Sequence, residues 1–250
     1  MAAPLPLLAA DDADSANADV SPSPSHHKHL RAKGTQTPSP TPSADDSTNS
    51  GAETAATPIP HPSVAPDASL DTDQLEDFSR QPLKIQSLIQ SALALTRQNL
   101  TYTYSSADPA NGGMDCSGFI YYVLTQAGIS DVPRDASEQY VWVRKANNFR
   151  AVISRGLDGF ETDELKPGDL LFWSGTYQTE HDPPVTHTMI YLGREKETGN
   201  RVMVGSSDGR SFHGLERWGV SVFDFKPVPP TPQPARRNSQ FIGYGAIPGF

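Results

Sequence analysis

Apolar residues are distributed unevenly along this 250-residue chain. Residues 1–75 are rich in Ala, Ser, Pro, Thr and Asp and contain almost no aromatic residues. A segment of this composition cannot bury enough apolar surface to offset its conformational entropy. We therefore predict a disordered, partly polyproline tail or linker over 1–75, followed by one folded domain over 76–250.

Within the predicted domain, the spacing of apolar residues changes from helical to strand-like. Helical spacing covers Leu83 to Leu95, and two further helices are predicted from Cys116 to about Gly128 and over 136–144. Alternating or continuous apolar runs predict strands near 169–173, 187–193, 201–206, 219–225 and 241–246, with a proline-rich loop over 226–240. Helices followed by strands are typical of an α+β fold, with the N-terminal helices packed on an antiparallel sheet.

Charge and composition exclude several classes of function. The formal net charge is −9, and no basic patch of the kind that nucleic-acid binders need is present. No apolar stretch has the length of a transmembrane helix. The first ten residues resemble the end of a secretory signal that lacks its basic start, and we interpret them as a truncated signal segment. The cluster His26-His27-Lys28-His29 lies in the tail, where no fixed geometry is expected, so we predict neither a metal site nor a cofactor.

Cys116 is the single cysteine of the chain, so it has no partner for an internal disulfide. It precedes an apolar helical run, and a thiol at a helix N-terminus is expected to have a lowered pKa and to act as a nucleophile. The alternative is a small buried residue without chemistry. His187 heads a predicted strand about seventy residues later, and histidine is the usual base for a cysteine nucleophile. We therefore predict that Cys116 and His187 form a catalytic pair.

Three motifs around this pair resemble the NlpC/P60 family of cysteine peptidases. They are Asp-Cys-Ser-Gly-Phe at 115–119, Leu-Lys-Pro-Gly-Asp-Leu-Leu-Phe-Trp at 165–173 and His-Thr-Met-Ile-Tyr-Leu-Gly at 187–193. Val132-Pro133-Arg134 and Gln139 are similar to a further family segment. The resemblance covers roughly residues 80–225. It implies a papain-like fold, export to the periplasm or cell envelope, and hydrolysis of an amide bond in peptidoglycan stem or cross-bridge peptides, often between γ-D-glutamate and diaminopimelate.

The resemblance also implies substrate-binding residues. Tyr104, twelve residues before Cys116, occupies a position where the family carries a tyrosine near the substrate. Asp115 and Ser117 are expected to line a subsite for the amine end of the substrate, and Asp115 also suits the N-cap of the helix. The segment Ser105-Ser106-Ala107-Asp108 departs from the Trp-Gly-Gly usual in the family.

The third catalytic position is the second departure. The family most often has a histidine there, on the strand after the His187 strand, but this chain has Val204, which cannot orient an imidazole. Ser206 lies on the same strand face as Val204 and is the first candidate. A Cys–His dyad is the second, His213 the third and Asp208, in a turn, the fourth.

Two alternative functions remain open on the sequence. The domain could be a catalytically inactive wall-binding module, because the third catalytic position is apolar. It could also be a thiol amidase or acyltransferase that acts on a substrate outside the wall. Trp173 and Trp218 are interpreted as packing residues, and His181 as a solvated histidine near the rim of the cleft.

Overall fold

The computed structural model of this protein describes residues 66–154, 156, 159–226 and 239–250. Most of the predicted tail, with the truncated signal segment and the His26–His29 cluster, lies outside the described residues. The central part of the predicted proline-rich loop, residues 227–238, lies outside them as well.

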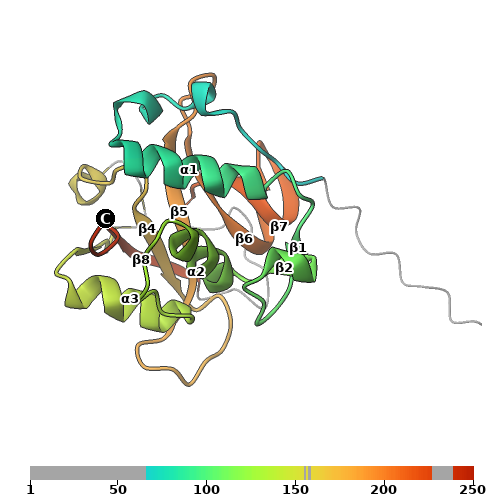
Figure 1. The fold of residues 1–250 in the computed structure, drawn as a ribbon. Coiled ribbons are helices and arrows are strands. Elements are labelled where there is room, and N and C mark those ends of the chain that lie inside the picture. The colour runs from blue at the N-terminus through green and yellow to red at the C-terminus, as the bar shows by residue number, and fades with distance from the viewer. Residues whose placement is uncertain (1–65, 155, 157–158, 227–238) are drawn as a thin grey trace, which may run out of the picture. The chain divides into compact units, whose positions relative to one another are not determined.

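A six-stranded antiparallel sheet forms the centre of the described domain (Figure 1). Its order is β3-β8-β4-β5-β6-β7, and a short parallel pair, β1-β2, forms a second sheet. The strands are β1 (Thr101–Tyr102), β2 (Gly113–Met114), β3 (Phe149–Ala151), β4 (Leu170–Ser174), β5 (Val185–Arg194), β6 (Arg201–Phe212), β7 (Leu215–Asp224) and β8 (Gln240–Gly245).

Three helices, α1 (Leu83–Leu95), α2 (Cys116–Gln126) and α3 (Ala136–Lys145), pack on one face of this sheet. Strand residues alternate between the two faces. Ile190 and Val204 pack with the helices, whereas Met189 and Met203 belong to a second cluster on the opposite face. The predicted α+β class, with N-terminal helices on an antiparallel sheet, is confirmed. None of the helices in the described ranges is long and apolar enough to cross a membrane.

The folded domain begins earlier than the sequence predicted. Ala68, Leu70 and Leu75 are buried in the main core. The backbone of Ala68 donates to Ser221 Oγ at 2.6 Å and accepts from the amide of Val222 at 2.8 Å. The predicted boundary after residue 75 is therefore wrong, because these isolated apolar residues pack along β7 although their local composition resembles that of the tail. Two short 3-10 helices, Thr72–Gln74 and Phe78–Arg80, lead from this segment to α1.

Strands β6 and β7 extend well beyond the predicted ranges. Their added parts form a polar hairpin, with pairs running from Ser207–Gly219 to Phe212–Leu215. Strand β5 pairs with β6 only over Ile190–Arg194, so the start of β5 and the end of β6 separate. This separation leaves room for the cavity described below. The hairpin also exposes Trp218 to 47%, which corrects the packing role predicted for this residue.

Candidate active site

Cys116 is the first residue of α2, and its position is fixed from both sides. Asp115 caps the helix as predicted, because its Oδ1 accepts a hydrogen bond from the amide of Gly118 at 2.6 Å. The preceding residue, Met114, ends β2, and its carbonyl accepts from Ser206 Oγ at 2.5 Å and from the amide of Thr103 at 3.2 Å. The thiol therefore lies at a helix N-terminus, and the strand before it, β2, is hydrogen-bonded to β6 of the main sheet.

The thiol lies against the part of β5 that carries His187. Its Sγ is 4.0 Å from the carbonyl oxygen of Thr186, and the backbone of Thr188 also interacts with it. These two residues flank His187 in the chain, so the structure places the thiol of Cys116 against the backbone segment that carries His187. His187 is buried, and its ring centroid lies 5.6 Å from that of Trp173.

The electrostatic state of Cys116 differs from the sequence prediction. Burial, and then the Asp115 carboxylate, raise the pKa of the thiol to about 12. Hydrogen bonds with the backbone of Thr188 and Ser117 act in the opposite direction but are weaker. The predicted lowering of the pKa by the helix N-terminus is therefore wrong for this structure, because loss of solvent and a neighbouring negative charge outweigh it. At neutral pH the group is the thiol, and a proton acceptor must take its proton during any attack.

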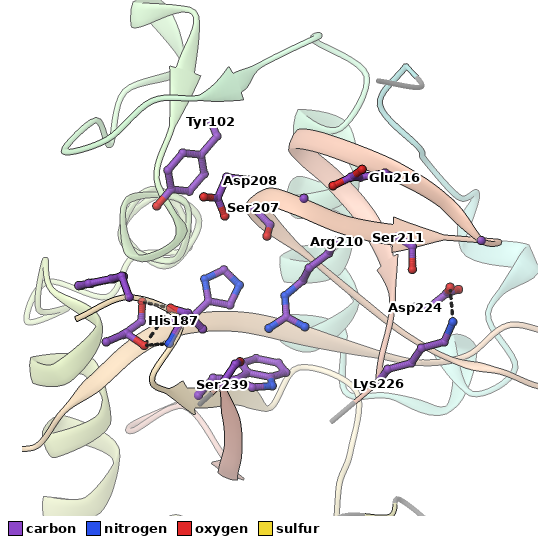
Figure 2. A pocket seen from close by; sticks show the side chains of 16 residues that line it. Tyr102, His187, Ser207, Asp208, Arg210, Ser211, Glu216, Asp224, Lys226 and Ser239 are labelled. Atoms are coloured by element: carbon purple, nitrogen blue, oxygen red, sulfur yellow. Dashed lines mark hydrogen bonds and ion pairs between the residues drawn. The ribbon is translucent and has the colours of Figure 1, made fainter. Parts of the chain in front are cut away.

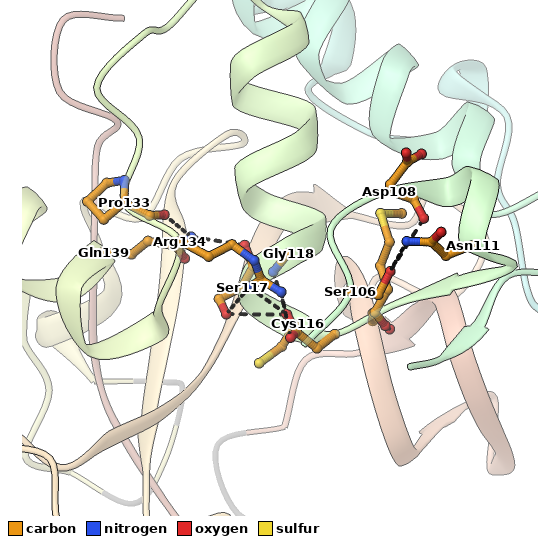
Figure 3. Close-up of polar contacts among 12 residues, drawn as sticks. Ser106, Asp108, Asn111, Cys116, Ser117, Gly118, Pro133, Arg134 and Gln139 are labelled. Carbon is orange, nitrogen blue, oxygen red and sulfur yellow. Dashed lines mark hydrogen bonds and ion pairs between the residues drawn. The ribbon is translucent and has the colours of Figure 1, made fainter. Parts of the chain in front are cut away.

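Arg134 and Gln139 support the segment around Cys116 (Figure 3). The guanidinium of Arg134 makes two bonds to Asp115, Nη1 to Oδ1 at 2.9 Å and Nη2 to Oδ2 at 2.7 Å, and reaches Ser117 Oγ at 3.0 Å. Gln139 Nε2 donates to the carbonyls of Ser117 and Pro133. The charge of Asp115 is thus partly offset, and the Pro133-Arg134 and Gln139 motif has a structural task that its sequence does not reveal.

Two cavities meet at this site. The first has a volume of about 250 Å³ and is lined by His187 and by the β6–β7 hairpin (Figure 2). The second has a volume of about 460 Å³ and is lined by Cys116, by the segment 134–136 and by the loop 177–181 between β4 and β5. Tyr102 and Tyr177 line both cavities. A chain bound across the thiol and the imidazole would therefore place one part in each cavity.

Tyr102, which the sequence analysis missed, lines both cavities. Its parallel partner in the β1–β2 pair is Met114, two residues before Cys116. Burial, and then the charges of a Cys116 thiolate and of Asp208, raise its pKa, so its hydroxyl keeps its proton. Tyr104, the predicted substrate tyrosine, is 82% exposed and lines the second cavity only. Tyr177 was missed as well, and burial followed by the same thiolate charge raises its pKa to about 12.

Ser206 lies on the opposite face of the sheet from His187. Val204 pairs with Ile190 and both face the helices, so Ser206, two residues further, faces the helices too. His187, three residues before Ile190, faces the other side. The structure therefore corrects the predicted role of Ser206, whose hydroxyl donates to Met114 instead of orienting the imidazole.

The other candidates for the third position separate clearly. Ser207 and Asp208 line the first cavity together with His187. In the view of Figure 2 their side chains lie above the imidazole of His187. The ring of His213 lies 2.8 Å from Glu195 and stacks on Phe212, and it lines neither cavity. The structure thus gives no support to His213, the third candidate, and retains the fourth, Asp208.

The two remaining predictions concern the rims of these cavities. His181 is exposed and lines the second cavity, which confirms the prediction of a solvated histidine at the rim. Trp173 is fully buried, which confirms its packing role, and it also forms part of the wall of the first cavity. Asp115 and Ser117 both line the second cavity, where the sequence expected a subsite.

Comparison with known proteins places the site in a family context. The model of the NlpC/P60 family matches residues 99–215. The γ-DL-glutamyl hydrolase of Bacillus subtilis is 30% identical over 92 residues, 37% of this chain and 18% of that protein. The murein DD-endopeptidase MepH of Escherichia coli is 27% identical over 130 residues, 49% of this chain and 42% of the relative. The γ-D-glutamyl-L-lysine dipeptidyl-peptidase of B. subtilis is 30% identical over 103 residues, 41% and 27% of the two chains. The chain therefore spans less than half the length of each of these relatives.

Proposed function

We propose that this chain, whose residues 99–215 form an NlpC/P60 domain, is a cysteine peptidase that hydrolyses an amide bond in peptidoglycan stem or cross-bridge peptides. One observation carries the proposal. The thiol that begins α2 lies against the backbone on both sides of His187, at the junction of two cavities. A nucleophile, a base and room for substrate on either side are the parts that amide hydrolysis requires.

The proposed reaction starts from the neutral thiol. His187 takes the proton of Cys116 while Sγ forms a bond to the amide carbonyl carbon. The amide N–H of Cys116 and the hydroxyl of Tyr102 donate to the developing oxyanion. When the intermediate collapses, the C–N bond breaks and the amine leaves with the proton held by His187. Water, deprotonated by His187, then hydrolyses the thioester and restores the thiol.

The names of the similar proteins support a specific bond. Two of the three are named for γ-glutamyl linkages and one for a murein DD linkage. We therefore propose the bond between γ-D-glutamate and the following diamino acid as the first bond to test. Because peptidoglycan lies outside the cytoplasmic membrane, this function requires an exported protein that works in the periplasm or the cell envelope.

A second candidate function is a catalytically inactive wall-binding module. The observation that favours it is the Cys116 thiol, whose pKa burial raises to about 12. A binding module needs no reactive thiolate, whereas an enzyme needs His187 to remove the proton during attack. The two functions differ in whether bound peptides are cleaved.

The deciding experiment is mass spectrometry of purified muropeptides after incubation with the protein. We expect loss of intact stem peptides, with products that end at γ-D-glutamate. Cys116→Ala removes little volume and should abolish cleavage while the melting temperature stays within a few degrees. Intact muropeptides that nevertheless bind both proteins would support the wall-binding module. Cleavage by the Cys116→Ala variant at the normal rate would refute the mechanism.

A further inference from the structure

In the proposed reaction, the first cavity receives the leaving half of a bound peptide. The acyl group becomes attached to Cys116, which lines the second cavity and not the first. The leaving amine takes its proton from His187, which lines the first cavity and not the second. The shape of the first cavity therefore decides how the amino acid on the leaving side is bound.

One wall of the first cavity is the distal part of the β6–β7 hairpin, residues 207–219. Its two strands contribute lining residues such as Ser211 and Glu216 (Figure 2), and its turn contributes Gly214. Within the described ranges, the strands of this part pair only with each other. A two-stranded hairpin is marginally stable by itself in water. This wall therefore needs further contacts with the domain to keep its position.

The hairpin bends back on itself, so that its tip lies beside the far end of its own strands. Asp224 of β7 pairs with Val202, near the start of β6. A fully extended strand would separate Val202 from His213 by about 36 Å. The amide of His213 nevertheless donates to Asp224 Oδ1 at 3.2 Å. The register shift between Asp208 and Arg210 is where β6 can bend in this way.

His213 is the first residue of the two-residue turn at this tip. Its φ is 52°, and that of Gly214 is 76°. Such turns favour Asn, Asp or Gly, because most other side chains are strained at positive φ. The conformation of the turn therefore does not explain why a histidine stands here.

The contacts of the His213 ring provide that explanation. Nε2 lies 2.8 Å from Oε2 of Glu195, the residue that directly follows β5. The Glu195 side chain is only 2% exposed, and Thr198 Oγ1 donates to the same oxygen at 2.7 Å. The ring also stacks on the buried Phe212. A hydrogen bond to a buried carboxylate is stronger than one between neutral groups, so this contact anchors the tip at a defined place.

We infer that the Glu195–His213 pair positions the hairpin as the wall of the first cavity and so determines how well an amino acid is bound on the leaving side. Both are positioning residues, because neither lines either cavity. The inference rests on the proposed function and deepens it, since it assigns the leaving-side subsite to a hairpin that is anchored outside the site.

The test compares two substrates with the full-length chain. One is the tripeptide L-Ala-γ-D-Glu-L-Lys, and the other is the γ-methyl ester of L-Ala-D-Glu, whose leaving methanol fills no amino-acid subsite. His213→Asn removes the ring but keeps a residue that accepts positive φ. We expect kcat/KM for the tripeptide to fall about tenfold, mainly through KM, which is the lower end of what one hydrogen bond to a charged group contributes. The methyl ester should be hydrolysed as by the wild type.

Two further variants and a structural measurement complete the test. Glu195→Gln should keep kcat/KM for the tripeptide within about threefold of the wild type, because the amide oxygen still accepts a hydrogen bond from the ring. Asp71→Asn is the matched control, since Asp71 Oδ1 lies 2.7 Å from Arg97 Nη2 and neither residue lines either cavity. It should leave both substrates unchanged. Amide hydrogen exchange over residues 207–218 should be faster in His213→Asn alone.

Normal tripeptide kinetics or normal hydrogen exchange in His213→Asn would overturn the inference. An equal loss on both substrates would overturn it as well, because it would indicate general damage to the fold. In each of these cases, Cys116-dependent hydrolysis by the wild type leaves the proposed function standing. Absence of Cys116-dependent hydrolysis of either substrate overturns both.

Discussion

Ser206 offers a direct test of the two roles that the sequence and the structure assign to it. In the structure its hydroxyl is buried and donates to the carbonyl of Met114 at 2.5 Å, so it stabilises the entry to α2. Ser206→Ala removes one of two hydrogen bonds to that carbonyl, because the amide of Thr103 still donates at 3.2 Å. The carbonyl keeps a partner, so we expect a loss of about 1 kcal/mol, the typical net value of one hydrogen bond. For a domain of this size that corresponds to a fall in melting temperature of about 2–4 °C.

The kinetic part of this prediction separates stability from catalysis. Because Ser206 faces away from His187, kcat should change by less than about threefold and the pH profile should not move. Ser221→Ala is a matched control, since Ser221 is an equally buried serine on β7 whose hydroxyl bonds Ala68 outside the site. It removes two hydrogen bonds to Ala68, so it should lower the melting temperature at least as much as Ser206→Ala and leave the kinetics normal. A tenfold loss of kcat with a shifted pH profile in Ser206→Ala alone would refute the structural argument and restore an orienting role.

Three further predictions follow from burial in the described domain. Iodoacetamide should modify Cys116 slowly at pH 7, because the raised pKa keeps the thiol protonated, and the rate should rise about tenfold per pH unit up to pH 9. Fast labelling that does not depend on pH would contradict this and indicate a preformed ion pair between Cys116 and His187. Removal of residues 1–65 should leave the melting temperature nearly unchanged. Removal of residues 1–75 should lower it by several degrees, because the buried residues Ala68, Leu70 and Leu75 are lost. Equal melting temperatures of the two truncated proteins would contradict the packing of residues 66–75. Burial raises the pKa of Asp169 to about 6, so its contribution to stability falls as the pH rises from 4 to 6. The free energy of unfolding of Asp169→Asn at pH 7, measured by denaturant unfolding, should therefore exceed that of the wild type by about 1–3 kcal/mol. At pH 4 the two free energies should be equal.

The regular parts of the fold could be predicted because their spacing carries the signal. Leu83–Leu95 has helical spacing and forms a helix with these bounds, and the apolar strands of the sheet centre lie close to their predicted positions. The polar end of β6 carries no such signal. Its residues form a strand because they pair with β7 along a hairpin that lines the first cavity, and long-range pairing of this kind is not visible in local composition.

The sequence predicts candidate reactive groups for the site but not the surroundings of these groups. The sequence predicts a pair of Cys116 and His187, and in the structure Cys116 begins α2 and His187 lies near the start of β5. Ser206 was chosen because it shares a strand face with Val204, yet the register sets both on the face opposite His187. A one-residue difference in register exchanges the two faces of a strand, so a motif alone cannot decide which side chain meets the imidazole.

The sequence alone also could not predict the pKa of the Cys116 thiol. A helix N-terminus and a buried position act on a thiol in opposite directions, and only the second depends on how the domain packs. Here α2 begins beneath the backbone of β5 and beside the Asp115 carboxylate, so burial and a negative charge raise the pKa above that of an ordinary thiol. In the mechanism that we propose, reactivity therefore comes from proton transfer to His187 while a substrate is bound. This mechanism couples the loss of the thiol proton to the formation of the carbon–sulfur bond, because the raised pKa keeps the thiol neutral before attack.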